Sequence, residues 1–181
     1  MSTYRNGTYV AFNGMGTTDP TLSDMKYYGL LQAWNNANHF DLTFSDSHKK
    51  TYSVQDTSLI TTLKARLLER LKNSKHLVLI ATEFASVNRG LLNWEIEKAV
   101  EVYGLPIIVV YPGFEKINAP NALRNRLPSK LIEYIDNDKV KTIHIPFKQK
   151  VIENTIKTFS VHNPPKYTNT IFTDDYYNNL Q

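Results

Sequence analysis

The sequence predicts an open, doubly wound α/β domain with a mainly parallel five-stranded sheet and helices on both faces. Strand-like and helix-like segments alternate about five times along the 181 residues, which is the pattern of a parallel sheet with crossover helices. Two strand-like runs, 76–81 and 106–111, are apolar at nearly every position, as expected for strands that are buried on both faces. A chain of this length can build one full hydrophobic core.

The first strand is predicted at Thr8–Phe12, a short apolar run rich in residues that favour strands. It leads into a loop at 13–20 that is rich in glycine and small polar residues. A helix follows, and either Thr21 or Ser23 can cap its start. One side of this helix is apolar and carries Met25, Tyr28, Leu31 and Trp34.

The second strand is predicted at His39–Phe44 and ends in a polar loop at 45–50. A clearly amphipathic helix is predicted at 58–73, because its leucines recur at helical spacing. The third strand, at 76–81, is followed by a loop at 82–88. In folds of this kind, sites form beyond the carboxyl ends of the strands, so the loops after the first three strands are expected to form the site.

The next helix is predicted as one continuous helix over 89–103, with Gly104 ending it. Its apolar residues recur three and four positions apart, which gives one buried stripe. Three further elements are predicted after it: a strand at 106–111, a strand at 140–145 and a helix at 148–159. The segment at 123–131 is ambiguous, and a short helix interrupted at Pro128 is one interpretation of it.

Residues 1–165 are predicted to form a single domain, and residues 166–181 a polar, tyrosine-rich tail. The pair Tyr176-Tyr177 in that tail is expected to belong to a disordered end rather than to a docking element. No internal repeat and no second domain is visible in the sequence.

Composition argues against several classes of protein. The formal charge of +4 comes from lysines and arginines that are scattered among acids, whereas nucleic-acid binders usually concentrate them. No apolar stretch is long enough to span a membrane. We therefore expect neither a nucleic-acid nor a membrane partner.

The N-terminus lacks the apolar core of a signal peptide, and the sequence contains no cysteine. These two features favour a cytoplasmic protein. The five histidines are isolated from one another along the chain, with no pair at metal-ligand spacing. We expect no metal site.

Glu95 is the residue that does not fit its surroundings in the helix predicted at 89–103. Helical neighbours lie three, four and seven positions away, and around Glu95 they are mostly apolar: Leu91, Leu92, Ala99 and Val102, with Lys98 as the polar exception. Glu97 falls instead on the polar face. A carboxylate in an apolar sector has a raised pKa or a partner, so Glu95 is either a functional group at a pocket wall or a rim residue paired with a base.

Several doubly wound families are excluded by their motifs. The chain has no Gly-Lys-Ser/Thr phosphate-binding loop, and Gly14-Met-Gly16 lacks the third glycine of a dinucleotide fingerprint. The positions that hold acidic residues in receiver domains are occupied by Asn13-Gly14 and Ala81-Thr82. No Gly-x-Ser-x-Gly nucleophile elbow is present.

What remains is a lone carboxylate near small-residue loops and near the aromatic residues Phe12 and Trp94. This set suits a reaction with a cationic transition state, such as cleavage of an N-glycosidic bond, because one carboxylate can stabilise an oxocarbenium-like sugar. Trp94 lies off the apolar stripe; it can form a self-association surface or pack under a neighbouring loop, and packing is favoured.

Four segments of the sequence, together covering roughly 8–111, resemble the TIR-like domains of the bacterial Thoeris anti-phage defence system, the ThsB proteins. The helix segment Arg89–Ala99 is similar to the signature helix of that family. Val10–Asn13 resembles its first strand, Phe40–Lys50 its second strand with an Asp-containing loop, and Leu63–Thr82 the following helix and strand. The chain departs from the family at Leu91, where the family has tryptophan, and at Asn13, where it has serine.

The resemblance implies an enzyme that cleaves NAD at the nicotinamide–ribose bond and makes a cyclic ADP-ribose-type signal, which activates a separate effector protein during phage infection. NAD is then a substrate, and no cofactor is implied. Glu95 matches the catalytic glutamate of the family. The residues expected to bind substrate are Phe12, Asn13, Gly14, Asp46 and Trp94. TIR-like enzymes often need assembly, so a homo-oligomer is also expected.

Two other functions stay open at this point. One is a nucleoside or nucleotide glycosyl-transfer enzyme, which also uses a glutamate on an α/β sheet. The other is a TIR-like module that binds or assembles without turnover, in which Glu95 is a structural rim residue and the 13–20 loop is a contact surface.

Overall fold

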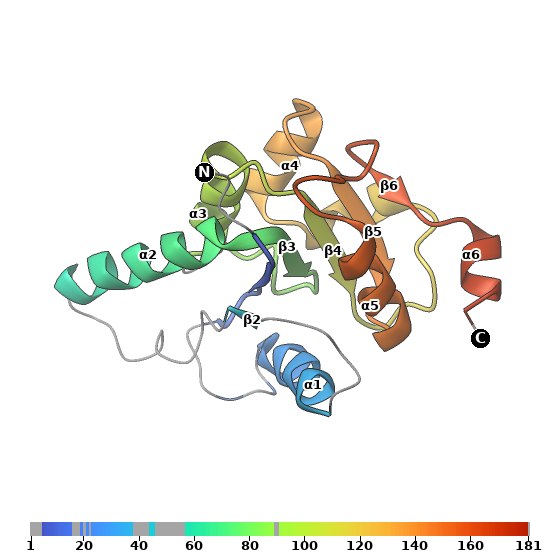
Figure 1. Cartoon of the computed structure of the whole chain (residues 1–181), viewed down its shortest axis with the longest axis horizontal. Coiled ribbons are helices and arrows are strands. Elements are labelled where there is room, and N and C mark those ends of the chain that lie inside the picture. Colours follow the sequence, from blue (N-terminus) through green and yellow to red (C-terminus); the bar gives the residue numbers. More distant parts are fainter. Residues whose placement is uncertain are drawn as a thin grey trace.

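The computed structural model describes residues 5–15, 19, 21, 23–37, 44–45, 57–88 and 91–180. At its centre is one six-stranded sheet in the order β2-β1-β3-β4-β5-β6, in which every neighbouring pair is parallel (Figure 1). The strands are β1 (Gly7–Ala11), β2 (Phe44–Ser45), β3 (Ser74–Ile80), β4 (Ile107–Tyr111), β5 (Thr142–Pro146) and β6 (Thr170–Ile171).

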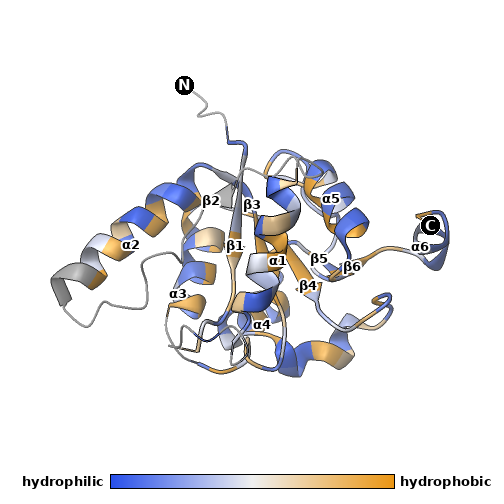
Figure 2. Ribbon diagram, turned by 90° about the horizontal axis from the view of Figure 1, so that it is seen from below, coloured by the Kyte–Doolittle hydropathy of each residue, from blue (hydrophilic) through white to orange (hydrophobic). Residues whose placement is uncertain are grey.

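Helices cover both faces of this sheet, which confirms the predicted fold class. The sheet has one strand more than the five predicted, because the two-residue β6 of the C-terminal segment pairs with the edge of β5. The helical segments are α1 (Met25–Asn36), α2 (Thr57–Lys72), α3 (Leu92–Glu97), the π-helix η3 (Lys98–Val102), the 3-10 helix η4 (Pro120–Arg126), α4 (Ser129–Asp136), α5 (Gln149–Thr158) and α6 (Asp174–Asn178). Figure 2 shows apolar strands inside and hydrophilic positions on the outer sides of the helices. None of the helices in the described part of the chain combines the length and apolar character needed to cross a bilayer.

Alternation along the strands divides the buried apolar residues between two cores. The α3-side core lies between the sheet and α2, α3 and α4, and it receives Tyr9 and Ala11 from β1. The α5-side core lies between the sheet and α1 and α5, and it receives Val10 and Phe12. Successive residues of a strand point to opposite faces, so consecutive residues of β1 contact different cores.

The central strands explain why their sequences are apolar throughout. Residues Leu77–Ile80 of β3 pair with Ile107–Val110 of β4, and all of these side chains are buried. Helices on both faces exclude water from this part of the sheet, so both faces must be apolar. The carboxyl ends of β1 and β3 meet at one edge, where the loops that follow them lie next to each other.

Three predicted elements differ from the structure by more than one or two residues at an end. Of the strand predicted at 39–44, only its last residue falls among the described residues, in β2. The helix predicted at 89–103 is not one regular α-helix, because α3 changes at Lys98 into the π-helix η3. The ambiguous segment 123–131 contains the end of η4 and the start of α4, with Pro128 at the N-cap of α4.

The C-terminal segment packs on the domain, so the expectation of a disordered end is wrong for Tyr176 and Tyr177. Strand β6 pairs with β5 and extends the sheet, and Tyr176 and Tyr177 pack against the α5-side core. The ring of Phe172 stacks on that of Tyr176, with centroids 3.7 Å apart. The aromatic residues that make this segment tyrosine-rich therefore provide its contact with the domain.

Candidate functional site

Glu95 lies in the first turn of α3, and its side chain is buried. Only 3% of its surface is exposed. Its helical neighbours Leu92 and Ile96 point into the α3-side core and fix this helix face toward the sheet. The carboxylate is thus placed inside the domain by the apolar stripe around it, as the helical spacing predicts.

One hydrogen bond to the carboxylate comes from β1. The Tyr9 hydroxyl donates to Glu95 Oε1, and both side chains are buried. Burial raises the pKa of Glu95 to about 7, while the hydrogen bond from Tyr9 opposes that rise. Near neutral pH, Glu95 therefore exists in both its protonated and its ionised form, which is a property of groups that exchange protons or stabilise charge.

Glu97, two residues further on, has the exposure and the pairing of an ordinary surface glutamate. Its side chain is 31% exposed and pairs with Lys98 at 2.6 Å. The hydrogen bond from Lys98 lowers the pKa of Glu97 from its ordinary value. The predicted contrast between a buried Glu95 and a solvated Glu97 is confirmed by this geometry.

Trp94 packs against the α3-side core with a partly buried ring, so it packs as favoured from the sequence, but its partners are the core and α2 and not a loop. The Lys64 ammonium group of α2 lies 5.3 Å from the centre of that ring, within the range of a cation–π contact. The indole therefore joins α3 to α2. Its expected role in substrate binding stays a prediction.

Asn13 ties the first loop to the third. Its side-chain amide donates hydrogen bonds to the carbonyls of Phe84 at 2.7 Å and Val87 at 2.9 Å. Its side-chain oxygen accepts a hydrogen bond from the Met15 backbone at 2.9 Å. One buried amide thus fixes the shape of both loops at the carboxyl ends of β1 and β3, immediately before α3 begins.

The other expected substrate-binding residues lie in different surroundings. Phe12 is buried in the α5-side core and stacks on Tyr28 with ring centroids 5.1 Å apart, so the structure does not bring it together with Glu95. Gly14 lies half-buried in the first loop between Asn13 and Met15, and Met15 has a positive φ of 53°. Asp46 lies outside the described residues.

Asp24 is a second buried carboxylate at this edge, and the sequence reasoning did not single it out. It is 0% exposed, and the Thr82 hydroxyl donates to its Oδ1 at 2.5 Å. Burial raises the pKa of Asp24 to about 6 against the opposing effect of the Thr82 bond. At the start of α1 it resembles an ordinary helix cap, which hides it from a sequence reading. In the sequence, only its position shortly after the glycine-rich loop at 13–20 points to a functional role.

Two buried histidines belong to the framework rather than to the site. His76 Nδ1 lies 2.7 Å from the Phe159 carbonyl, which can only accept, so Nδ1 carries the proton and Nε2 accepts from the Thr8 hydroxyl at 2.8 Å. His144 contacts the hydroxyls of Tyr111 and Thr142, each at 2.8 Å. Burial lowers the pKa of each histidine to about 4, so both are neutral and unsuited to proton transfer at pH 7.

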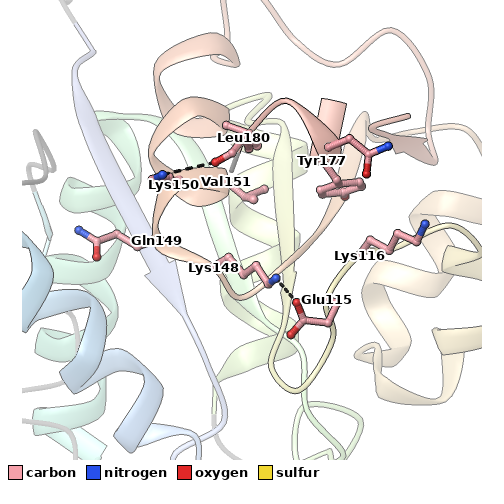
Figure 3. Close-up of a pocket in the computed structure, with 9 residues that line it drawn as sticks. Glu115, Lys116, Lys148, Gln149, Lys150, Val151, Tyr177 and Leu180 are labelled. Carbon is pink, nitrogen blue, oxygen red and sulfur yellow. Dashed lines mark hydrogen bonds and ion pairs between the residues drawn. The ribbon is translucent and has the colours of Figure 1, made fainter. Parts of the chain in front are cut away.

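A separate cavity of about 410 Å³ lies between the start of α5 and the C-terminal segment (Figure 3). Lys148 pairs with Glu115 at its wall, and Lys150 donates to the Leu180 carbonyl at 3.4 Å. None of the site residues named above lines this cavity. Its basic groups are engaged by neighbouring protein groups, and it is not part of the edge that carries Glu95.

Comparison with known protein families finds a match over more than half of the chain. Residues 9–117, which are more than half of the chain, match the family described as Thoeris protein ThsB, TIR-like domain. The matched region runs from β1 past β4 and contains Tyr9, Asn13, Asp24, Thr82 and Glu95.

Proposed function

The chain belongs to the family of Thoeris ThsB proteins with a TIR-like domain, and from this premise we propose that it cleaves NAD at the nicotinamide–ribose bond. Membership of the family gives it a role in Thoeris defence. The proposed product is a cyclic ADP-ribose-type nucleotide that activates a separate effector protein. NAD is the substrate, and the reaction needs no other cofactor.

The observation that carries this proposal is the state of Glu95. Its carboxylate is buried on α3, held by the Tyr9 hydroxyl, and has a pKa raised by burial to about 7. A low-dielectric site strengthens the attraction between a carboxylate and a positive charge that develops during the reaction. Such a group is costly for folding, and proteins keep costly carboxylates mainly at functional sites.

In the proposed reaction, the bond between the ribose anomeric carbon and the nicotinamide nitrogen breaks, and its electron pair leaves with nicotinamide. The ionised Glu95 carboxylate stabilises the oxocarbenium-like ribose. An adenine nitrogen or a ribose hydroxyl of the same molecule then forms a bond to the anomeric carbon, which closes a ring, and a proton is released from the adenine amino group or from that hydroxyl. Attack by water gives linear ADP-ribose instead.

The test is incubation of the purified protein with NAD at low and high protein concentration, with products separated by chromatography and identified by mass. We expect nicotinamide and a product with the mass of cyclic ADP-ribose. Higher activity per molecule at high concentration would indicate the expected homo-oligomer. Glu95→Gln should lose most activity, because the amide keeps the shape of the side chain but not its charge.

Glu97→Gln is the matched control, because it makes the same chemical change two residues away on the solvated side of the helix. It should keep activity close to that of the unmodified chain. Full turnover in Glu95→Gln would exclude this mechanism. Nicotinamide with only linear ADP-ribose would keep the cleavage step and exclude the cyclic signal.

One observation favours a second function, a TIR-like assembly module without turnover. Glu95 is 3% exposed, and a carboxylate that is closed off by its own hydrogen bond can serve as a structural link between α3 and β1. If the chain is such a module, NAD that is incubated with it in lysate from phage-infected cells is not cleaved at any protein concentration. Turnover in infected lysate but not in buffer would instead identify a missing trigger.

A further inference from the structure

Asp24 carries a buried carboxylate oxygen that its own fold leaves without a hydrogen bond. Oδ1 accepts from the Thr82 hydroxyl at 2.5 Å. Oδ2 is also buried, and it has no hydrogen-bond partner within the part of the chain that the structure describes. Burying an unsatisfied polar atom destabilises the folded state, and more so when the group is charged, so such an atom requires an explanation.

Helix capping does not explain it. Asp24 is the N-cap residue of α1, where an aspartate side chain usually accepts a backbone N–H of the first turn, but its side chain makes no capping bond. The Ser23 hydroxyl accepts from the Met25 backbone at 3.2 Å instead. The Asp24 side chain therefore does not cap α1, although aspartate is suited to that role.

A purely structural link between α1 and β3 does not explain it either. The Thr82 bond makes that link with one oxygen, and a hydroxyl or amide at position 24 could accept it without burying a charge. A carboxylate adds a second, charged acceptor whose burial raises its pKa. The chain tolerates this cost although no protein group in the described part of the chain donates a hydrogen bond to Oδ2.

The position of Asp24 indicates what could use it. In the order β2-β1-β3-β4, the chain runs from β1 to one side of the sheet and from β3 to the other, so β1 and β3 flank the topological switch point. Ligands of doubly wound folds bind beyond the carboxyl ends of the strands at this point. Asp24 lies there, with its backbone N–H on the Asn13 carbonyl at 3.3 Å and its side chain on Thr82.

We propose that Asp24 is a substrate-binding residue whose Oδ2 accepts a hydrogen bond from a donor group of the dinucleotide, either a ribose hydroxyl or the carboxamide N–H of nicotinamide. This inference rests on the proposed function and adds a second carboxylate to the site, with a task different from that of Glu95. Glu95 stabilises charge in the reaction, and Asp24 orients the substrate before it.

Binding without turnover tests the inference. NAD affinity is measured by titration calorimetry at pH 8 for Glu95→Gln and for the double variant Glu95→Gln/Asp24→Asn. Asparagine keeps an oxygen for Thr82 and replaces Oδ2 by a donor, so it cannot accept the bond from the substrate. We expect the double variant to bind NAD about 10-fold or more weakly.

Thermal denaturation of the same proteins separates this role from a structural one. Removing the buried charge of Asp24, while an oxygen remains to accept from Thr82, should leave the melting temperature at pH 8 unchanged or raise it, while NAD affinity falls. A structural link predicts the opposite, a lower melting temperature with NAD affinity unchanged in the folded protein, and that pair of results would overturn the inference.

A second ligand identifies which group of NAD donates the hydrogen bond to Asp24. This ligand is nicotinic acid adenine dinucleotide, in which a carboxylate replaces the carboxamide. If the carboxamide donates, Glu95→Gln binds this analogue more weakly than NAD, and Asp24→Asn reduces the difference. If a ribose hydroxyl donates, Asp24→Asn weakens both ligands by the same factor. Both results support the inference and assign the donor.

Failure of the inference can be distinguished from failure of the proposed function. NAD cleavage by the unmodified chain, together with equal NAD affinity in both variants, rejects the role of Asp24 alone. Absence of both cleavage and NAD binding rejects both. Should Glu95→Gln fail to bind NAD while the unmodified chain turns it over, the KM of Asp24→Asn decides: a KM raised about 10-fold supports the inference, and an unchanged KM rejects it.

Discussion

Two acidic residues, Glu95 on α3 and Asp24 at the start of α1, are buried with raised pKa values, while Glu97 on the same helix as Glu95 is solvated. Neither buried group gains a positive partner strong enough to restore its ordinary pKa, since burial is the first cause of each shift. Both therefore lower the free energy of unfolding when they ionise. This cost can be measured separately from activity.

Stability should fall with pH because of Glu95. Its pKa is about 7 in the folded chain against an ordinary 4.5, so between these values the folded chain holds the extra proton and the free energy of unfolding decreases as the pH rises. Glu95→Gln removes this term. We expect the variant to match the unmodified chain at pH 4 and to be more stable by up to about 3 kcal/mol at pH 8, as measured by urea unfolding.

Glu97→Gln is again the control, and its stability should track that of the unmodified chain closely, because surface ion pairs contribute little. Asp24 also makes the free energy of unfolding fall as the pH rises, by a smaller amount, between its ordinary pKa of 3.8 and its raised pKa of about 6. This contribution persists in Glu95→Gln. A constant difference between Glu95→Gln and the unmodified chain from pH 4 to 8 would contradict a raised pKa at Glu95.

Tyr9 should set the pH at which Glu95 acts. Its hydroxyl donates to the carboxylate and lowers the pKa of Glu95 against the effect of burial. The proposed mechanism needs the ionised form, so NAD cleavage should rise with pH through about 7. In Tyr9→Phe the pKa of Glu95 rises further, and the rising limb should move by about one pH unit or more to higher pH.

The measurement is the pH dependence of kcat for both proteins between about pH 5.5 and about pH 9. A structural role of Tyr9 would lower kcat by the same factor at every pH and leave the limb in place. That outcome would remove Tyr9 from the control of the charge on Glu95.

Sequence alone predicted Glu95 because a helix has a fixed period, so its neighbours three and four positions away are known from the chain. It did not predict Tyr9, because that contact spans 86 positions and depends on the register of α3 against β1. Asp24 was missed for a different reason. An aspartate before a helix fits a cap, and only the structure shows that the cap is not made.

Among the elements, the helix that carries Glu95 differs most from its prediction. Apolar spacing predicted one helix over 89–103, but five residues after Glu97 form a π-helix, in which the Tyr103 backbone donates to the Lys98 carbonyl at 3.3 Å. A π-turn inserts one residue into the helix and rotates the residues after it, and such turns are frequent near functional sites. Side-chain periodicity cannot detect it, because Ala99 and Val100 still pack against the α3-side core, although Val102 is 56% exposed.

Gly104 ends this helix in a conformation that favours glycine. Its φ is +61°, and no atom lies within 4 Å of the position that a Cβ would take. Gly104→Ala should therefore cost about 1 kcal/mol from backbone conformation alone, as measured by urea unfolding.

Gly29→Ala is the matched control, since it also meets no atom within 4 Å but lies inside α1. Alanine is favoured there by about 0.5–1 kcal/mol, so the two variants should change stability in opposite directions. A stabilised Gly104→Ala would show that the helix end does not require the left-handed conformation.

At the scale of the whole molecule, the prediction of a domain at 1–165 with a tail at 166–181 is not tested by the structure itself. The structure shows that the tail segment contributes β6 at the edge of the sheet and aromatic contacts to the α5-side core. In Figure 1, β6 lies beside β5 and α6 at the far end from α2. The sequence pattern of this segment was too short and polar to reveal a two-residue strand.

Removing residues 166–181 should destabilise the domain if this packing matters. The deletion exposes the edge of β5 and withdraws Phe172, Tyr176 and Tyr177 from the α5-side core. Each partly buried aromatic contributes about 1 kcal/mol or more through apolar area and ring contacts. We expect a loss of several kcal/mol in urea unfolding and greater self-association, since an exposed strand edge promotes pairing between chains.

Two substitutions separate the contribution of the aromatic contacts to stability from that of a surface ion pair: Phe172→Ala and Asp174→Asn. Phe172 stacks on Tyr176, so its loss should reproduce about 1–2 kcal/mol of the destabilisation. Asp174 pairs with Lys116 at 2.5 Å on the surface, with both side chains about half exposed, and its loss should change stability by less than about 1 kcal/mol. If the deletion leaves stability unchanged, residues 1–165 fold as an independent domain. The aromatic contacts of the tail then form as a consequence of folding and do not support it.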